Sequence, residues 1–370
     1  MRPTICFSLL LAARICAGPA VVPTAELRTA FFDKLFAGAQ RLDAEVDGLE
    51  GGGISLWRGG ITYEQERNGW TVTTVLAQTW TSIDYEPTIV TSPAHRSEET
   101  QEASLEVRRR LSDAWELSAA ARAYDGFSDY RSLWVAEYYD QFAGFLPGYE
   151  YADPRGAAVT LGGVWTYLPR AGKLGASFTY GRDHIVPAWT AEGASATRTR
   201  DVIDTISARL LWETALHPRL KMQHSLRVTD VTARSLRTQL NSELVWAATD
   251  RLSLRLHGGG AQESPDFDAW FAGAALEYEF TQAWHAGLSA RWYEDTGELE
   301  TSNFNTAAPG VSTRELAVSL LWKGESAAVR LSLGHYETNY DALSADNLFF
   351  GNLYRDRDFL TARLACTFYF

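Results

Sequence analysis

The sequence of 370 residues contains only three cysteines and two methionines. Cys6 and Cys16 lie before residue 20, so a chain that loses this part keeps Cys366 alone and can form no internal disulfide. No stretch approaches the roughly 18 uninterrupted apolar residues that a membrane-spanning helix needs, and the mean hydropathy is -0.20. The sequence therefore excludes both a disulfide-stabilised scaffold and a helical membrane protein.

The chain also lacks an excess of basic residues. It has 34 Lys and Arg against 46 Asp and Glu, which gives a net charge of -12. Proteins that bind nucleic acids through the phosphate backbone normally present a basic surface, so no nucleic-acid partner is expected. The seven histidines show no metal-ligand spacing, so we expect neither a metal site nor a cofactor.

Aromatic residues, by contrast, are abundant, with 13 Trp, 16 Tyr and 17 Phe. Residues 1–20 have the order of a secretory signal peptide: a positive Arg2, an apolar run over residues 5–13 and a small-residue exit at Gly18-Pro19-Ala20. We therefore expect export through a signal peptide whose cleavage position stays open.

The segment 21–66 differs from the rest of the chain. Apolar residues recur in it at spacings of three, four and seven, which predicts an amphipathic helix over 25–47; they are Leu27, Phe31, Leu35, Leu42, Val46 and Leu49. A glycine run at 51–53 follows. We expect 21–66 to be a periplasmic or lumen-docking segment, although 54–66 could also be the arm of a hairpin, joined to the next strand through Asn68-Gly69.

From residue 67 onward, segments that alternate apolar and polar residues are separated by connections that are alternately short and long. The expected strands are 69–85, 98–111, 115–125, 157–168, 173–185, 201–216, 220–231, 235–248, 251–262, 269–280, 283–295, 313–323, 327–338 and 358–370. Each is long enough to cross a bilayer. Tight turns at one rim and long loops at the other are typical of outer-membrane barrels.

The alternation has a consistent composition. Trp284, Leu288 and Trp292 form one apolar row, and each such row tends to end in an aromatic residue, where a girdle at the lipid boundary would lie. A soluble β-sandwich would also alternate, but its outer face would rarely stay rich in arginine. The sequence therefore predicts an all-β fold: a closed, antiparallel, up-and-down transmembrane β-barrel over residues 67–370. Because single-chain barrels of bacteria have an even strand number, about 14 strands are favoured and 16 is the alternative.

The last residues carry a resemblance. The terminal row of Leu364, Phe368 and Phe370 resembles the C-terminal phenylalanine signal of bacterial outer-membrane β-barrel proteins. No narrower family is recognised. The resemblance implies a location in the bacterial outer membrane, contact with its lipid, and insertion by the barrel-assembly machinery.

Residues opposite the lipid-facing rows would line the lumen. Ten arginines are predicted there: Arg108, Arg110, Arg122, Arg209, Arg227, Arg237, Arg255, Arg291, Arg330 and Arg363. Fewer acids share that face, so the lumen would have a net positive wall that selects anions. The alternative is that these arginines pair with glutamates across neighbouring strands inside a filled barrel.

The connection 125–156 is too long for a simple loop and too aromatic for a disordered one. Its candidate binding residues are Tyr130, Trp134, Tyr138, Tyr139, Phe142 and Tyr149. Folded inward, this loop would narrow the pore and offer stacking faces to a solute. Packed on its own neighbours, it would be an external lid.

These features favour an outer-membrane passive channel, similar to a porin, for small anionic or hydroxyl-rich solutes, with the oligomeric state left open. A sealed barrel that binds a surface partner is the alternative. A hydrolase is less favoured because its candidate pairs, Asp183-His184 and His224-Ser225, are adjacent strand residues that point to opposite faces. His224 would even face lipid, as would Arg109, which is tolerable there only if it reaches a rim by snorkelling.

Overall fold

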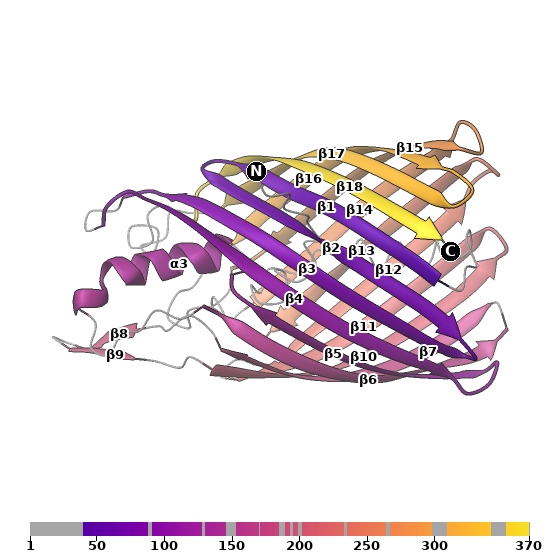
Figure 1. Ribbon diagram of the computed structural model, residues 1–370, viewed down its shortest axis with the longest axis horizontal. Coiled ribbons are helices and arrows are strands. Elements are labelled where there is room, and N and C mark those ends of the chain that lie inside the picture. Colours follow the sequence, from indigo (N-terminus) through magenta and orange to yellow (C-terminus); the bar gives the residue numbers. More distant parts are fainter. Residues whose placement is uncertain are drawn as a thin grey trace.

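The computed structural model describes residues 40–87, 91–127, 130–145, 153–169, 171–184, 189–192, 195–198, 202–232, 235–263, 267–297, 309–341 and 353–369. Sixteen described strands form one closed antiparallel barrel (Figure 1). Each strand pairs with its neighbours in the sequence, and β1 pairs with β18 to close the cylinder. The predicted fold class is therefore confirmed.

The barrel strands have these bounds: β1 (Gln40–Gly51), β2 (Ile54–Arg67), β3 (Trp70–Tyr85), β4 (Ala94–Arg110), β5 (Trp115–Asp125), β6 (Arg155–Leu168), β7 (Gly172–His184), β10 (Val202–His217), β11 (Leu220–Val231), β12 (Arg237–Ala247), β13 (Leu252–Glu263), β14 (Phe267–Glu279), β15 (Trp284–Asp295), β16 (Val311–Lys323), β17 (Ala327–Tyr340) and β18 (Arg357–Tyr369). Outside the barrel lie β8 (Trp189–Glu192), β9 (Ser195–Arg198), α3 (Tyr130–Gln141) and η1 (Ala143–Phe145).

The two ends of the barrel differ as expected. Short turns join the strands at one end, and the longer connections that carry α3 and the β8–β9 hairpin lie at the other, on the left of Figure 1. Outer-membrane barrels have short periplasmic turns and longer extracellular loops. We therefore call these the periplasmic and the extracellular end.

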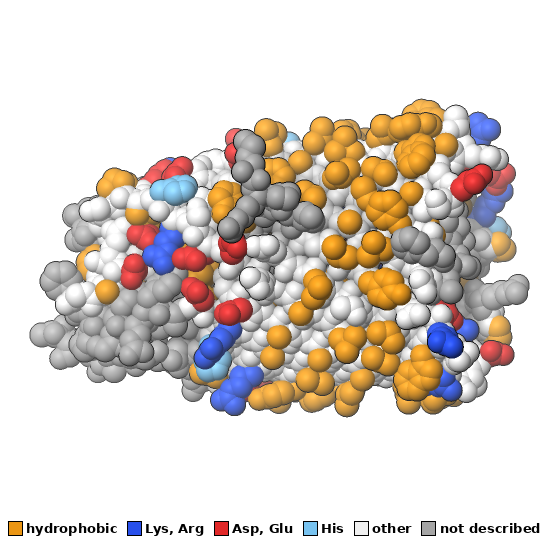
Figure 2. Space-filling view, in the orientation of Figure 1, with side chains coloured by type: hydrophobic (Ala, Val, Ile, Leu, Met, Phe, Trp, Pro, Cys, Tyr) orange, Lys and Arg blue, Asp and Glu red, His pale blue; other side chains and the backbone are white. Residues whose placement is uncertain are grey.

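The outer face carries the apolar rows. Leu288 is 50% exposed and Trp284 is 44% exposed, and Figure 2 shows a broad band of hydrophobic side chains around the periplasmic part of the wall. Charged side chains gather beyond that band at both ends (Figure 2). Such a surface suits lipid. Among the described residues, no helix is long and apolar enough to cross a bilayer.

The predicted helix over 25–47 is wrong from residue 40 onward, and its earlier residues lie outside the described part of the chain. Residues 40–51 form β1, in which Leu42, Ala44 and Val46 pair with the outward row of β18. The apolar spacing of 40–49 fits a strand as well as a helix, since Leu42, Ala44 and Val46 also alternate with acids. Pairing with both β18 and β2 decides in favour of the strand.

The strand count follows from the same correction. Residues 54–66 belong to β2 and lie in the barrel wall, so they are not a periplasmic or lumen-docking segment. With β1 and β2 added, the favoured count of 14 is wrong and the alternative of 16 is right. The glycine run is the β1–β2 hairpin turn, in which Gly52 and Gly53 adopt φ angles of 56° and 77°, a conformation that glycine reaches without steric cost. The signal segment 1–20 lies outside the described residues.

Candidate functional site

The inner face of the barrel is charged and internally paired. Eight of the ten predicted arginines lie within 4.0 Å of a carboxylate: Arg108 with Glu64, Arg110 with Glu66, Arg122 with Glu102, Arg237 with Glu263, Arg255 with Glu243, Arg291 with Glu315, Arg330 with Glu277, and Arg363 with Glu45. Strand register creates these pairs; Arg291 lies directly opposite Glu315, for example. For these eight residues the geometry matches the alternative of mutual neutralisation.

Two of the ten arginines are neighbours across adjacent strands. Arg209 of β10 lies directly opposite Arg227 of β11, and both side chains are half-buried on the inner face. Ser177 lies opposite Arg209 on the other side, and Gln239 lies opposite Arg227. Like charges that face each other across a sheet repel.

Arg110 departs from its predicted place. Its side chain is 58% exposed at the last residue of β4, beside the turn at the periplasmic rim. Arg109, which points outward, also reaches that rim: it donates a hydrogen bond to the Asn68 carbonyl at 2.7 Å and covers the Trp70 ring at 4.8 Å. The expected snorkelling of Arg109 is thus what the structure shows.

One charged cluster on the inner wall is not among the predicted lumen residues. Arg58 of β2 donates to Glu102 of β4, and Arg122 of β5 lies 3.6 Å from the same carboxylate. Arg58 and Glu102 are both buried. The sequence signal for Arg58 is its parity, which is opposite to that of the outward Ile61 and Tyr63. It carries weight only once 54–66 is recognised as part of the wall.

The helix α3 occupies the extracellular mouth. Its residues Leu133, Trp134, Val135 and Ala136 have no exposed surface. They pack in one cluster with inward-facing residues near the ends of barrel strands and with the connection before β18; these partners are Leu49, Ile54, Ile83, Tyr85, Leu353, Tyr354 and Phe359. Within the connection 125–156, α3 is therefore folded onto the inner wall of the mouth.

This packing buries some of the predicted binding residues and leaves others partly exposed. The Trp134 ring lies 5.4 Å from the Tyr85 ring and is covered by the Arg357 guanidinium at 5.3 Å, so it holds the helix in place and offers no face to a solute. Tyr139 is also buried. Tyr130, Tyr138 and Phe142 keep partial exposure. Burial raises the pKa of the Tyr138 hydroxyl. Tyr149 lies outside the described residues.

Polar contacts fix α3 to both sides of the mouth. Arg96 of β4 lies 3.1 Å from Glu137 and 3.2 Å from Asp140. On the other side, Arg131 donates to the Tyr340 hydroxyl of β17 at 3.0 Å. The helix thus joins strands that are far apart in the sequence, and its displacement would require loss of the apolar contacts and of both polar attachments.

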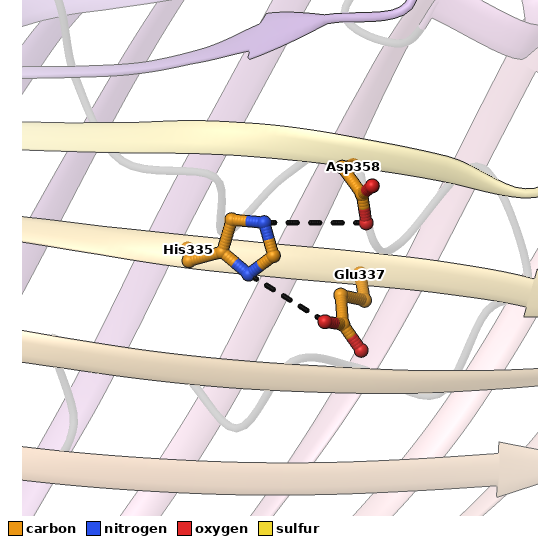
Figure 3. A group of neighbouring side chains, drawn as sticks. All are labelled: His335, Glu337 and Asp358. Carbon is orange, nitrogen blue, oxygen red and sulfur yellow. Dashed lines mark ion pairs between the residues drawn. The ribbon is translucent and has the colours of Figure 1, made fainter.

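One group of possible metal ligands lies on the outer face near the extracellular end. The ring of His335 stands between Glu337 and Asp358 (Figure 3), with nitrogen–oxygen distances of 3.7 and 4.0 Å. Each nitrogen faces a different carboxylate, and one ion could take only one of the two nitrogens. The arrangement therefore suits a histidine ring paired with two carboxylates better than a chelated metal.

The hydrolytic candidates do not assemble. Asp183 faces inward and accepts a hydrogen bond from Tyr124 at 2.8 Å, whereas His184 is exposed on the other face. His224 faces outward and Ser225 is buried on the inner side. The actual partner of His224 is Ser242 of β12, with Nδ1 and Oγ 2.8 Å apart. The backbone amides of this region are engaged in the strand ladder, which leaves no oxyanion donors beside this pair.

Two of the three residues of the predicted assembly signal lie on the outer wall. Leu364 and Phe368 are exposed on the outer face of β18, and Phe370 lies outside the described residues. Recognition of this row by the assembly machinery stays a prediction.

Comparisons with known proteins bear on the fold. No protein-family model and no curated protein matches the sequence. Among solved structures, a bacterial polysaccharide outer membrane secretin is similar with 9% identity and a TM-score of 0.55, covering 90% of this chain and 99% of its own. CdiB from Acinetobacter baumannii is similar with 8% identity and a TM-score of 0.53, covering 88% of this chain and 60% of its own. These similarities show the fold: the chain forms a closed β-barrel like those of these outer-membrane proteins.

Proposed function

We propose that this protein is a passive channel of the outer membrane for small anionic or hydroxyl-rich solutes. The observation that carries the proposal is the number of strands. A barrel of eight strands is filled by its own side chains, whereas barrels of 16 to 18 strands leave an aqueous channel. The sixteen strands described here therefore favour a water-filled lumen.

The chemistry of the inner wall supports the same proposal. Ionised side chains inside a protein need water or an oppositely charged partner. Arg255 and Glu243, for example, form an ion pair, and both side chains remain partly exposed to solvent. Arg209 and Arg227, which lie opposite each other on neighbouring strands, are the candidates for contact with a passing anion.

The helix α3 would set the width of the entrance. Because it packs on the inner wall of the mouth, it narrows the extracellular end without a separate plug domain. Its partly exposed residues Tyr130, Tyr138 and Phe142 are the candidates for stacking against a sugar ring or another flat apolar face. The similar secretin is described as a polysaccharide protein, so neutral sugars belong among the solutes to be tested.

Single-channel recording in planar bilayers tests the proposal. We expect discrete openings with chloride favoured over potassium, and we expect a variant in which residues 128–153 are replaced by a short glycine–serine linker to conduct more. Heat-dependent migration on gels would verify that both proteins are folded. No conductance from either folded protein would reject the channel.

One observation favours a second function, which is that of a sealed barrel that binds a surface partner. Four residues of α3 are fully buried, which makes the mouth a firmly packed surface. This function predicts that the wild-type protein is electrically silent and that replacement of the loop abolishes partner binding. The recordings described above separate the two functions.

A further inference from the structure

The lipid-facing wall contains a groove that the proposed channel does not use. It has a volume of about 510 Å³ and spans five consecutive barrel strands, β5, β6, β7, β10 and β11. Its outward-facing lining is apolar: Leu117, Leu161, Gly163, Ala176, Phe178, Ala208, Leu210, Leu226 and Val228. Elsewhere on this wall, large side chains such as Leu288 stand out from the surface.

The strand register explains the shape of the groove. Leu117, Gly163, Ala176, Leu210 and Leu226 lie side by side in one row across the five strands. Gly163 and Ala176 are small, so the side chains in the middle of the row project less from the wall than those at its ends. The next row toward the extracellular end is likewise low at Ala208, beside Phe178. The groove is therefore a product of residue size at defined register positions.

The row on the periplasmic side of the groove is aromatic and polar. Trp115, Trp165, Leu174, Trp212, His224 and Ser242 follow one another across six strands. Trp115 is the first residue of β5, whereas His224 is the fifth residue of β11. The row therefore starts at the periplasmic rim, where tryptophans mark the level of the lipid headgroups, and climbs into the wall toward His224.

His224 is an unusual member of that row. Its ring stacks on Trp212, with centroids 5.4 Å apart, and Nδ1 lies 2.8 Å from the Ser242 hydroxyl. Among the described contacts, Nε2 is the ring nitrogen left to donate. An ionisable residue on a lipid-facing wall is costly, and such residues usually serve a function.

We propose that the groove and His224 form a binding site for one glycerophospholipid of the periplasmic leaflet. An acyl chain would lie over Gly163, Ala176 and Ala208, and His224 Nε2 would donate to an ester or phosphate oxygen at the interface. The groove is continuous with the lipid-facing band, so the occupant that always surrounds it is lipid.

The site differs from ordinary lipid contact in two ways. It has a low middle flanked by larger side chains, and it has a polar side chain, His224, in the row on its periplasmic side. A second copy of this chain is the other occupant to consider. The polar groups beneath the groove, however, already bond within the chain: Trp212 Nε1 donates to the Tyr167 hydroxyl at 2.8 Å.

Native mass spectrometry tests the proposal. The purified protein would be released from mixed micelles of detergent and palmitoyl-oleoyl phosphatidylethanolamine. We expect the wild type to retain one lipid. The A176L/A208L variant fills the groove and should lose it, whereas A290L, a matched change on the lipid-facing side of β15, should keep it. The H224L/S242A variant should bind it about tenfold more weakly, which corresponds to the loss of one hydrogen bond to a charged group.

Three results would overturn the proposal. The first is equal lipid retention by the wild type and the folded A176L/A208L variant. The second is no retention by the wild type. The third is a wild-type dimer that A176L/A208L abolishes, since this would assign the groove to a second copy. Gel migration before and after heating would verify that every variant is folded. None of these results depends on whether the lumen conducts.

Discussion

Arg209 and Arg227 lie directly opposite each other on β10 and β11, with both side chains on the inner face of the barrel. Most of the other predicted lumen arginines lie opposite or beside a glutamate, as Arg291 does with Glu315. Strand register thus places two arginines side by side at one position of the wall and an arginine beside a glutamate at others.

Replacement of this pair should change the ion selectivity. We expect R209Q/R227Q to lower the chloride-to-potassium permeability ratio by about fifteenfold, because two unit charges roughly 10 Å from a passing ion in water contribute about 0.4 kcal/mol each, attracting chloride and repelling potassium. The reversal potential in a salt gradient measures this ratio.

The matched control removes a neutralised pair. R255Q/E243Q eliminates one arginine together with its carboxylate, 3.3 Å away, and leaves the net charge of the lumen unchanged. Its permeability ratio should stay close to that of the wild type. An equal change in both variants would contradict the assignment of selectivity to Arg209 and Arg227.

The second prediction concerns the packing of α3 in the mouth. Trp134→Ala should weaken the docking of the helix by about 3–5 kcal/mol, the usual cost of truncating a buried tryptophan. The loosened helix should allow larger and noisier single-channel currents and faster cleavage of the loop by protease. Gly144→Ala is the control in the same loop, because no atom lies within 4 Å of the added Cβ.

The third prediction tests which face of the wall meets lipid. Leu288→Arg should destabilise the barrel by about 2–4 kcal/mol, as a cation does near the middle of the bilayer. Ser289→Arg is the matched change on the inner face, where the neighbours are Ala275 and Ala317, and it should cost much less. Urea titration of the protein folded in lipid vesicles measures both. Equal destabilisation would argue against the orientation described here.

The fourth prediction tests the closure of the barrel by β1. Ala44 of β1 lies opposite Cys366 of β18, and directly paired strand residues fall within the Cα separation that a disulfide allows. In a chain with Cys6 and Cys16 changed to serine, Ala44→Cys should oxidise with Cys366 and become protected from a maleimide reagent. Val46→Cys, opposite Leu364, should stay reactive. Protection of Val46→Cys in place of Ala44→Cys would show a shifted register.

The sequence by itself determined the barrel. The alternation of apolar and polar residues from residue 67 onward predicted fourteen strands whose limits agree with the structure to within a few residues, because a strand between lipid and water must alternate with a period of two. It also identified the faces of Leu288 and Arg291. These are local properties, and each segment carries them in its own composition.

Only the tertiary structure decided the rest. Residues 40–51 form a strand because β18 and β2 offer backbone hydrogen-bonding partners on both sides. Both partners are in place only when the first and last strands of the barrel come together. Which glutamate an arginine contacts depended on register, as did the juxtaposition of Arg209 with Arg227 and of His224 with Ser242. The burial of Trp134 required the inner wall of the mouth to exist. Contacts between distant segments set these features, and no pattern within one segment encodes them.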